Sequence, residues 1–330
     1  MSKLDDLLAG LSPEQRRLLE LRLKRQHQDA EKKRVLVSIR PDGTRRPFFC
    51  MHSAMGSVGY YANLARHLHP DQPFYGVQSL GLEAEQEPLT RVEEMAAYYL
   101  DAIRLVQAQG PYRLGGHSSG GLIAFEMARQ LHRQGEGVEL LVLLDTQLPD
   151  RLLAGGEDPN AAVDDALLWV RLTEAMGLLV GRSLPMSREA LQRLEPEAQL
   201  DYVLETLIES NALPLPQKFG SYPAQVRRLL LRRLLRVFNA NFSAAQNYAP
   251  QPYAGVITLF QVSERRGAGG RTPRQADGGT DAGGWERFSS PPPEVHVVPG
   301  DHVTMMAEPG VGAVAERLNA CLEGLPARAA

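Results

Sequence analysis

Three residues of this chain have the types and the chain order that serine-based acyl transfer requires. Ser118 lies in the stretch Gly116-His117-Ser118-Ser119-Gly120, which fits the G-x-S-x-G pattern of a nucleophile elbow. Asp145 ends an apolar run further along the chain, and His302 follows the last such run. A serine hydroxyl becomes an effective nucleophile only when a base removes its proton and a carboxylate orients that base. We therefore expect Ser118 to be the nucleophile, Asp145 the acid and His302 the base.

The residues around Ser118 predict a sharp turn between a strand and a helix. Tyr112–Leu114 are strand-like, and Leu122–Ala128 give a helix with an apolar face. Small residues two positions before and after the serine let the backbone pass close by. The free N–H groups and the positive dipole end of the helix would face the place where an oxyanion forms. This placement, more than the short pattern itself, favours a catalytic Ser118.

Other side chains are weaker candidates for the acid and the base. Asp145 and His302 both follow the carboxyl ends of predicted strands, where open α/β sheets place their sites, and Asp150 is the second candidate acid. His296 lies inside the last predicted strand and is expected to be structural. His117 occupies the variable position of the elbow, so its side chain is expected to point away from the reaction. The histidines at positions 27, 67, 69 and 132 lie in charged or surface-like helical contexts.

An oxyanion in such a site needs two backbone N–H donors. The first is expected to be that of Ser119, the residue after the nucleophile. The second is expected from the loop His52-Ser53-Ala54-Met55-Gly56, which follows a predicted strand. Within this loop we favour Ala54, with its neighbour Met55 as the alternative. His52 is expected to shape the loop and not to transfer protons.

The bulk composition excludes several classes of protein. The 330 residues are 43% apolar, which is enough for one large α/β domain with an insertion or for two modest domains. The net charge of −3 gives no sign of a nucleic-acid or anionic-membrane partner. Two cysteines, Cys50 and Cys321, cannot form a disulfide framework. With neither an apolar signal core nor a spanning run in the sequence, we expect a cytoplasmic protein.

The chain divides into four segments. Residues 1–33 are expected to contain a helix that begins with a capping box at Ser12-Pro13-Glu14-Gln15, either a linker or docking helix or a solvated helix at a chain end. Residues 34–147 and 248–330 alternate strands with helices, which predicts a mostly parallel sheet with helices on both faces. Residues 148–247 contain helical patterns only, so we expect a helical insertion over the sheet.

Periodicity and turn signals predict the individual elements. A second capping box, Thr90 with Glu93, is expected to open the helix at 90–109, and the Gly-rich stretch 266–284 is expected to be a mobile loop. The strands are expected at 35–39, 48–51, 74–77, 112–114, 138–144, 256–262 and 295–298, and further helices at 60–68, 169–180, 187–194, 197–210, 224–247 and 311–322.

One predicted helix is unusually basic. Its arginines at 227, 228, 232, 233 and 236 interleave with leucines. The first interpretation is an amphipathic helix with a solvated basic face, and the second is a contact for an acidic carrier domain or its phosphate-bearing arm. No P-loop, G-x-G-x-x-G or metal-ligand spacing is present in the sequence, so no cofactor and no metal is expected.

Taken jointly, these motifs resemble the type I thioesterase domains that end non-ribosomal peptide and polyketide synthases. The resemblance spans about 48–322. It implies an α/β-hydrolase fold with Ser118 as nucleophile, Asp145 as acid, His302 as base, and a lid over the acyl chamber formed by the insertion. It also implies Ala54 and Ser119 as oxyanion donors. The motifs that carry it are residues 49–57, 112–121, 143–146, 247–255 and 300–306.

The resemblance implies a substrate and a partner as well. The substrate would be an acyl or peptidyl chain on the phosphopantetheine arm of a carrier-protein domain, with that domain upstream in the same synthase. Residues 11–20 resemble the short linkers between modules of such synthases, which suggests an excised terminal domain or a small protein that keeps such a segment. Ser119 departs from many relatives, which carry a larger apolar residue there. The alternatives are a stand-alone editing (type II) thioesterase, a general carboxylesterase or a catalytically silent binding module.

Overall fold

The structure is a computed structural model. It describes residues 12–82, 86–149, 165–179, 184, 186–210, 222–267, 270–273 and 282–325. The second candidate acid, Asp150, and parts of the expected insertion lie outside the described residues.

Seven of the described strands form a sheet in the order β1-β3-β2-β4-β5-β6-β9, with β1 antiparallel to β3 and the other neighbours parallel. The central strands β2 and β4 are fully buried, as is most of β5, because helices cover both faces of the sheet. The expected mostly parallel sheet is thereby confirmed. The strands are β1 (Leu36–Arg40), β2 (Phe48–Met51), β3 (Phe74–Val77), β4 (Tyr112–His117), β5 (Val138–Leu144), β6 (Thr258–Val262) and β9 (Glu294–Val298).

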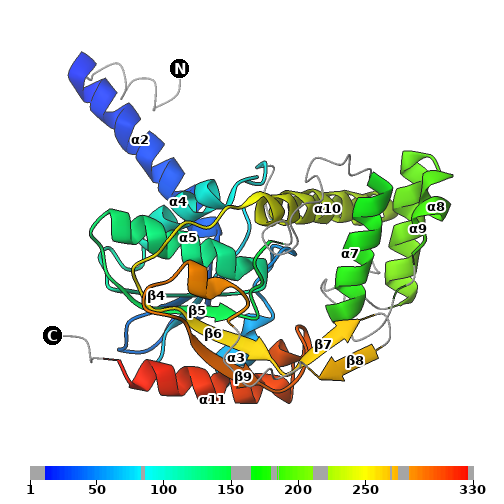
Figure 1. Ribbon diagram of the computed structural model, residues 1–330. Coiled ribbons are helices and arrows are strands. Elements are labelled where there is room, and N and C mark those ends of the chain that lie inside the picture. The colour runs from blue at the N-terminus through cyan, green and yellow to red at the C-terminus, as the bar shows by residue number, and fades with distance from the viewer. Residues whose placement is uncertain are drawn as a thin grey trace.

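Helices pack on both faces of the sheet (Figure 1). Helices α4 (Val92–Ile103) and α5 (Ser119–Arg133) cover one face, and α3 (Tyr61–His67) and α11 (Gly310–Glu323) cover the other. Side chains of β2 alternate between the two cores, since Phe49 and Met51 join the first while Phe48 and Cys50 join the second.

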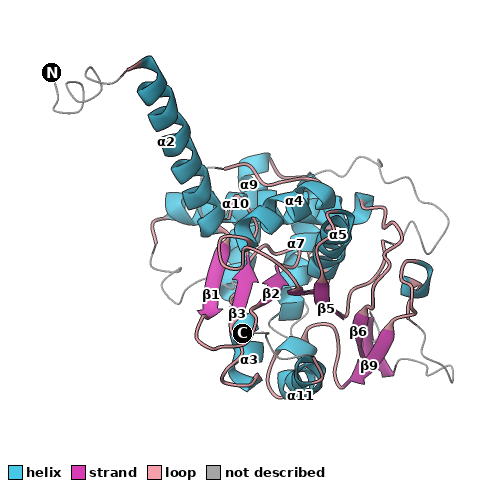
Figure 2. Cartoon of the chain, turned by 90° about the vertical axis from the view of Figure 1, so that its left-hand side faces the viewer, coloured by secondary structure: helices cyan, strands magenta, loops and turns pink. Residues whose placement is uncertain are grey.

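Helix α2 (Pro13–Arg34) projects from the body of the molecule in both views (Figures 1 and 2). Its predicted capping box is present, because Ser12 Oγ accepts from the Gln15 N–H and the Gln15 side chain accepts from the Ser12 N–H. Its last turn is tied to α4 by an ion pair between Lys32 and Asp101, 2.7 Å apart. The leucines at 18, 21 and 23 are more than half exposed.

The second predicted capping box is wrong. Helix α4 begins at Val92, and its N-cap, Arg91, makes no side-chain capping hydrogen bond. Thr90 therefore lies before the cap, and Glu93 is the second helical residue, one position short of where a capping box needs it. The buried face of α4, which packs in the core shared with α5 and the sheet, begins at Val92, so the helix starts with its first buried residue.

Between β5 and β6 the described elements are helices, as the sequence predicts. They are α7 (Asp165–Leu179), α8 (Arg188–Gln192), α9 (Pro196–Glu209) and α10 (Ala224–Asn247). Their apolar residues form a third cluster, which includes Trp169, Leu172, Val203, Leu207 and Phe238. This insertion therefore has a small core of its own, beside the sheet and not within it.

The stretch expected to be a mobile loop contains ordered elements at both of its ends. Strands β7 (Glu264–Gly267) and β8 (Gly270–Pro273) form an antiparallel pair that follows β6. At the other end, the buried Trp285 donates its indole N–H to the Thr146 carbonyl at 2.9 Å. Residues 274–281 lie outside the described part of the chain.

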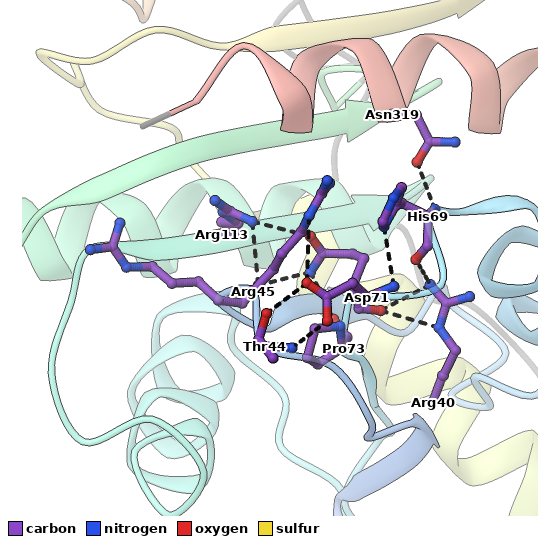
Figure 3. Close-up of polar contacts among 10 residues, drawn as sticks. Arg40, Thr44, Arg45, His69, Asp71, Pro73, Arg113 and Asn319 are labelled. Carbon is purple, nitrogen blue, oxygen red and sulfur yellow. Dashed lines mark hydrogen bonds and ion pairs between the residues drawn. The ribbon is translucent and has the colours of Figure 1, made fainter. Parts of the chain in front are cut away.

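The amino ends of the parallel strands carry a dense polar network, part of which is drawn in Figure 3. Asp71 accepts from the N–H and the hydroxyl of Thr44, both at 2.7 Å, while Arg40 donates to backbone carbonyls of the α3–β3 connection. The buried guanidinium of Arg113 pairs with Glu139 at 2.7 Å. Because these polar groups pair their hydrogen-bond donors and acceptors with one another, we expect this end of the sheet to contribute to stability.

Candidate active site

Ser118 lies between the last residue of β4 and the first residue of α5. Its backbone has φ 58° and ψ −130°, a conformation that costs a non-glycine residue on the order of 1–3 kcal/mol. The Ser118 N–H donates to the Leu144 carbonyl at 2.9 Å, and its own carbonyl accepts from the Gly121 N–H at 3.0 Å. These bonds hold the strained turn beside the carboxyl end of β5.

Gly120 brings the start of α5 against the end of β2. A Cβ atom at this position would lie 2.5 Å from the carbonyl oxygen of Met51 and 2.6 Å from that of His52. Only glycine permits so close an approach of two backbones. The amino end of α5, which begins at Ser119, therefore meets the loop His52–Gly56.

Asp145 follows β5 directly and is almost fully buried, with 5% of its surface exposed. Its φ of 44° is also in the left-handed region, and its N–H donates to the Phe260 carbonyl on β6 at 2.7 Å. Its Oδ2 lies 2.6 Å from His302 Nδ1. Burial alone would raise the pKa of this carboxyl, but the hydrogen bond and charge of His302 outweigh it, so the pKa is lowered.

His302 is presented by a turn that Asp301 organises. The Asp301 carboxylate accepts from the N–H groups of Val303 and Thr304, at 3.1 and 2.9 Å, and Thr304 Oγ1 accepts from the Asp301 N–H at 2.8 Å. Gly300, with φ 97°, makes the reversal out of β9. The His302 side chain remains 39% exposed, so one edge of its imidazole is open to a substrate.

The structure therefore brings the three predicted residues to one edge of the sheet. Ser118, Asp145 and His302 follow the carboxyl ends of β4, β5 and β9. A carboxylate that orients a partly exposed imidazole, with a serine on a strained turn at the same edge of the sheet, is the arrangement used for nucleophilic acyl transfer.

The loop His52–Gly56 is rigidly held. His52 is fully buried; its Nδ1 donates to the Ser53 carbonyl at 2.8 Å, and its Nε2 accepts from the Tyr99 hydroxyl at 2.8 Å. Burial lowers the pKa of His52 to about 4, so it stays neutral near pH 7. A neutral imidazole bonded on both nitrogens shapes the loop and is not free to transfer protons, as the sequence predicts.

The prediction for His117 is wrong in one respect, because its side chain contacts the candidate base. The two imidazole rings are stacked, with centroids 4.6 Å apart, and His117 Nε2 donates to the His302 carbonyl at 2.8 Å. In the β4–β5 register His117 pairs with Leu144, whose side chain joins the core beneath α3 and α11. His117 thus points to the same face of the sheet as Leu144, where it meets the loop that carries His302. The sequence around His117 does not predict this contact.

Burial keeps His117 neutral. The residue is 6% exposed, and burial together with the nearby charge of His302 lowers its pKa to about 3. Since a carbonyl oxygen can only accept, the Nε2 of His117 must carry the hydrogen. His117 is a contact of the site that sequence reasoning missed, and Asp301 is another.

His296, His67 and His132 lie in structural or surface settings, as the sequence predicts. His69 instead follows α3 and is not in a helix, and its Nδ1 accepts from the Asp71 N–H at 3.2 Å. His296 on β9 packs on Phe260 and lies 3.8 Å from the Cys321 sulfur, a structural setting. His67 pairs with Glu308 at the surface. Within the described ranges, no cluster of three His, Cys, Asp or Glu side chains is placed to hold a metal ion. None of the described helices is both long and apolar enough to cross a membrane.

The arginines of α10 are largely matched by carboxylates of this chain. Arg228 bonds Asp201 of α9 at 2.5–2.6 Å, Arg232 pairs with Glu197, and Arg236 lies 2.8 Å from Glu87. These pairs favour the first interpretation of the basic stretch, an amphipathic helix, over the second, a contact surface for an acidic carrier domain.

Comparisons with known proteins agree with this fold. The family model described as "Thioesterase domain" matches residues 46–322. Chondramide synthase from Chondromyces crocatus is 30% identical over 86% of this chain, and a dimodular nonribosomal peptide synthase from Bacillus subtilis is 42% identical over 69% of it. The chain spans only 7% and 8% of the lengths of these two relatives.

Among solved structures, a four-domain nonribosomal peptide synthetase bound to AMP and glycine aligns with 88% of this chain. Its TM-score is 0.74 and its identity 29%, and the match covers 20% of that protein. The NocB thioesterase domain, in covalent complex with a fluorophosphonate nocardicin G analog, aligns with 87% of this chain. In that case the TM-score is 0.58 and the identity 22%, and the match covers 99% of the domain.

Proposed function

Because the chain belongs to the thioesterase domain family of α/β-hydrolase fold, we propose that it releases an acyl or peptidyl chain from a carrier-protein phosphopantetheine thioester. The observation that carries this proposal is the 2.6 Å contact between His302 Nδ1 and Asp145 Oδ2, at the same edge of the sheet as a serine held at φ 58°. Such a pair supplies the base that Ser118 needs.

In the first step, Ser118 Oγ attacks the thioester carbonyl carbon while His302 Nε2 takes the hydroxyl proton. Asp145 holds the Nδ1–H and stabilises the imidazolium that forms. The C–S bond then breaks, and His302 returns the proton to the departing thiol of the phosphopantetheine arm. The chain is left as an ester on Ser118.

The negative charge of the tetrahedral intermediate is stabilised by backbone N–H donors. We assign these to Ser119 and to Ala54, with Met55 as the alternative to Ala54. The close approach of Gly120 to Met51 and His52 supports this assignment, because it brings both donor segments together. A lost oxyanion donor costs about 10²–10³ in kcat in serine hydrolases.

In the second step, the ester on Ser118 is resolved by water or by a hydroxyl or amine of the chain itself, with His302 as the general base. The helices between β5 and β6 would act as a lid over the acyl chamber, and exclusion of water would favour cyclisation. Every step uses groups of the protein and the substrate, so the proposed mechanism needs no cofactor.

The partner in this proposal is a carrier-protein domain, upstream in the same synthase. The proposal is supported by the relatives, which are large synthases of which this chain spans a small share, and by the four-domain synthetase among the solved structures. Helix α2, which projects from the body, would then be part of the linker to that domain.

Two alternatives share the same catalytic groups. An editing (type II) thioesterase would also hydrolyse carrier-bound thioesters, but it would prefer short misloaded chains. A carboxylesterase would prefer oxygen esters and would be indifferent to the carrier protein.

The test offers one acyl chain in two forms, a thioester loaded on a carrier protein and a simple oxygen ester, to the wild type and to Ser118→Ala. We expect the thioester to be preferred, an acyl adduct on Ser118 by mass spectrometry, and activity reduced by about 10⁴-fold or more in Ser118→Ala. Faster turnover of the oxygen ester regardless of the carrier would favour the esterase. Activity that survives in Ser118→Ala would refute the nucleophile assignment.

A further inference from the structure

Asn241 connects a helix of the insertion to the loop that contains Ala54 and Met55. The residue lies in α10 and is 3% exposed. Its Nδ2 donates to the Ala54 carbonyl at 3.1 Å, and its Oδ1 accepts from the Ser79 hydroxyl at 3.2 Å. Since a carbonyl oxygen can only accept, the amide nitrogen must face Ala54.

Peptide planarity makes this contact important for the oxyanion donors. The Ala54 carbonyl and the Met55 N–H belong to one flat peptide group and point in opposite directions. In the same way, the Ser53 carbonyl fixes the direction of the Ala54 N–H. The Ser53 carbonyl is held by His52 Nδ1 at 2.8 Å and by the Gly56 N–H at 2.9 Å. Asn241 therefore holds the one carbonyl of this pair that the loop does not hold itself.

The loop is also packed against α10. A Cβ atom on Gly56, whose φ is 80°, would lie 3.0 Å from Ser79 Cβ and 3.4 Å from Asn241 Nδ2. The Met55 side chain is buried in the apolar cluster of the insertion, together with Phe238 of α10. Contacts from the insertion therefore hold the loop His52–Gly56, which we call the oxyanion loop.

Helix α10 belongs to both parts of the molecule. Leu231, Leu234 and Phe238 join the cluster of the insertion, whereas Ala244 and Tyr248, at its carboxyl end, join the core formed with α4 and α5. In Figure 1 the helix runs from beside α5 out to α7 and α8. Asn241 lies on it between the two sets of contacts.

We propose that Asn241 is a positioning residue for the oxyanion loop, through which α10 orients the Met55 N–H opposite that of Ser119. The proposal rests on the proposed function and takes Met55 as the donor, because the Ala54 carbonyl shares its peptide group with the Met55 N–H and not with the Ala54 N–H. A rotation or shift of α10 would turn the Ala54–Met55 peptide, so the position of the insertion and the competence of the oxyanion hole are coupled.

The test compares Asn241→Leu and Asn241→Asp with the control Asn239→Leu. Both Asn241 variants remove the amide donor and keep the number of side-chain heavy atoms, and Asn241→Asp also keeps the volume. Asn239 lies on the same helix, where it bonds Ser243 and not the loop. The substrate is a p-nitrophenyl ester, whose hydrolysis needs Ser118 and the oxyanion hole but no carrier protein. We expect kcat to fall about 10- to 100-fold with KM nearly unchanged in both Asn241 variants, because a misdirected donor costs less than a lost one.

A second readout separates positioning from packing. A boronic acid that bonds Ser118 mimics the tetrahedral intermediate, and we expect its affinity to fall in step with kcat/KM in the Asn241 variants. Thermal unfolding identifies variants that are folded. Wild-type kcat in a folded Asn241→Leu or Asn241→Asp protein, or an equal loss in Asn239→Leu, would overturn the proposal. Because the ester assay is independent of the carrier protein, failure of the proposed thioesterase function would be seen separately, in the wild-type preference for esters over thioesters.

Discussion

In the described part of the chain, the two non-glycine residues with positive φ are Ser118 and Asp145, at 58° and 44°. Both conformations are held by backbone hydrogen bonds to neighbouring strands, from Ser118 to Leu144 and from Asp145 to Phe260. Strain of this kind persists only where the surroundings over-determine it. Backbone strain therefore occurs at the two positions from which a nucleophile and its acid would act.

Substitution of His117 tests the stacked histidine at the scale of a single residue. His117→Ala removes both the ring and the donor to the His302 carbonyl, so the imidazole of His302 loses two constraints. We expect kcat to fall by up to about 100-fold with little change in KM, since a misplaced catalytic group affects the reaction more than binding. His117→Gln, which keeps an N–H donor, should recover part of the loss. Steady-state kinetics on the same ester measures both effects.

The control is His132→Ala, because His132 is exposed near the far end of α5. The low-field proton signal of His302 Nδ1–H provides a structural readout of its bond to Asp145. A folded His117→Ala protein with wild-type kcat and an unshifted signal would contradict the positioning role.

At the scale of elements, the site depends on how closely the start of α5 meets the end of β2. Gly120→Ala would place a methyl group 2.5–2.6 Å from two backbone carbonyls. We expect the free energy of unfolding to fall by about 1–3 kcal/mol, the usual cost of overpacking, and kcat to fall as well, because α5 must retreat from the oxyanion loop. Chemical denaturation measures the first effect and ester hydrolysis the second.

Gly312→Ala is the matched control for that substitution. Gly312 lies inside α11, where a Cβ atom would meet nothing within 4 Å. Here alanine should stabilise the protein by about 0.5–1 kcal/mol through helix propensity. Equal stability of the two alanine variants would show that the α5–β2 contact is less tight than the structure indicates.

At the scale of the whole molecule, two buried histidines make the fold sensitive to acid. Burial lowers the pKa of His52 to about 4 and that of His117 to about 3, whereas an unfolded histidine titrates near about 6.5. As the pH falls below about 6.5, the unfolded chain therefore binds protons first. Their contribution to stability is complete above that pH and is lost between about pH 6.5 and the folded-state values.

Urea unfolding at pH 7 and pH 5 measures this loss. We expect the free energy of unfolding to fall by up to about 1.4 kcal/mol per pH unit for each histidine. His117→Phe should show a smaller dependence on pH, since one of the two groups is removed. Equal stability of the wild type at the two pH values would contradict the burial of neutral histidines.

Local patterns in the sequence predict much of this molecule. The apolar runs at 48–51 and 138–144 become strands with the expected bounds, because strands buried on both faces leave a continuous apolar signature. The helix at 224–247 also has the expected bounds. The capping box at Thr90 fails because packing of α4, and not its local cap, decides where that helix begins. The β7–β8 pair is missed because its strands carry no apolar alternation.

The sequence by itself determined which chemistry is available, since Ser118, Asp145 and His302 are recognised by type, by chain order and by their places after predicted strands. Only the tertiary structure decided what holds these residues in place. His117 meets the His302 carbonyl across 185 residues of chain, and Asn241 meets the Ala54 carbonyl across 187. Contacts of this kind depend on which strands become neighbours and on where an insertion packs. Neither segment encodes its partner locally, because a hydrogen bond between distant segments leaves no periodic signal in either one.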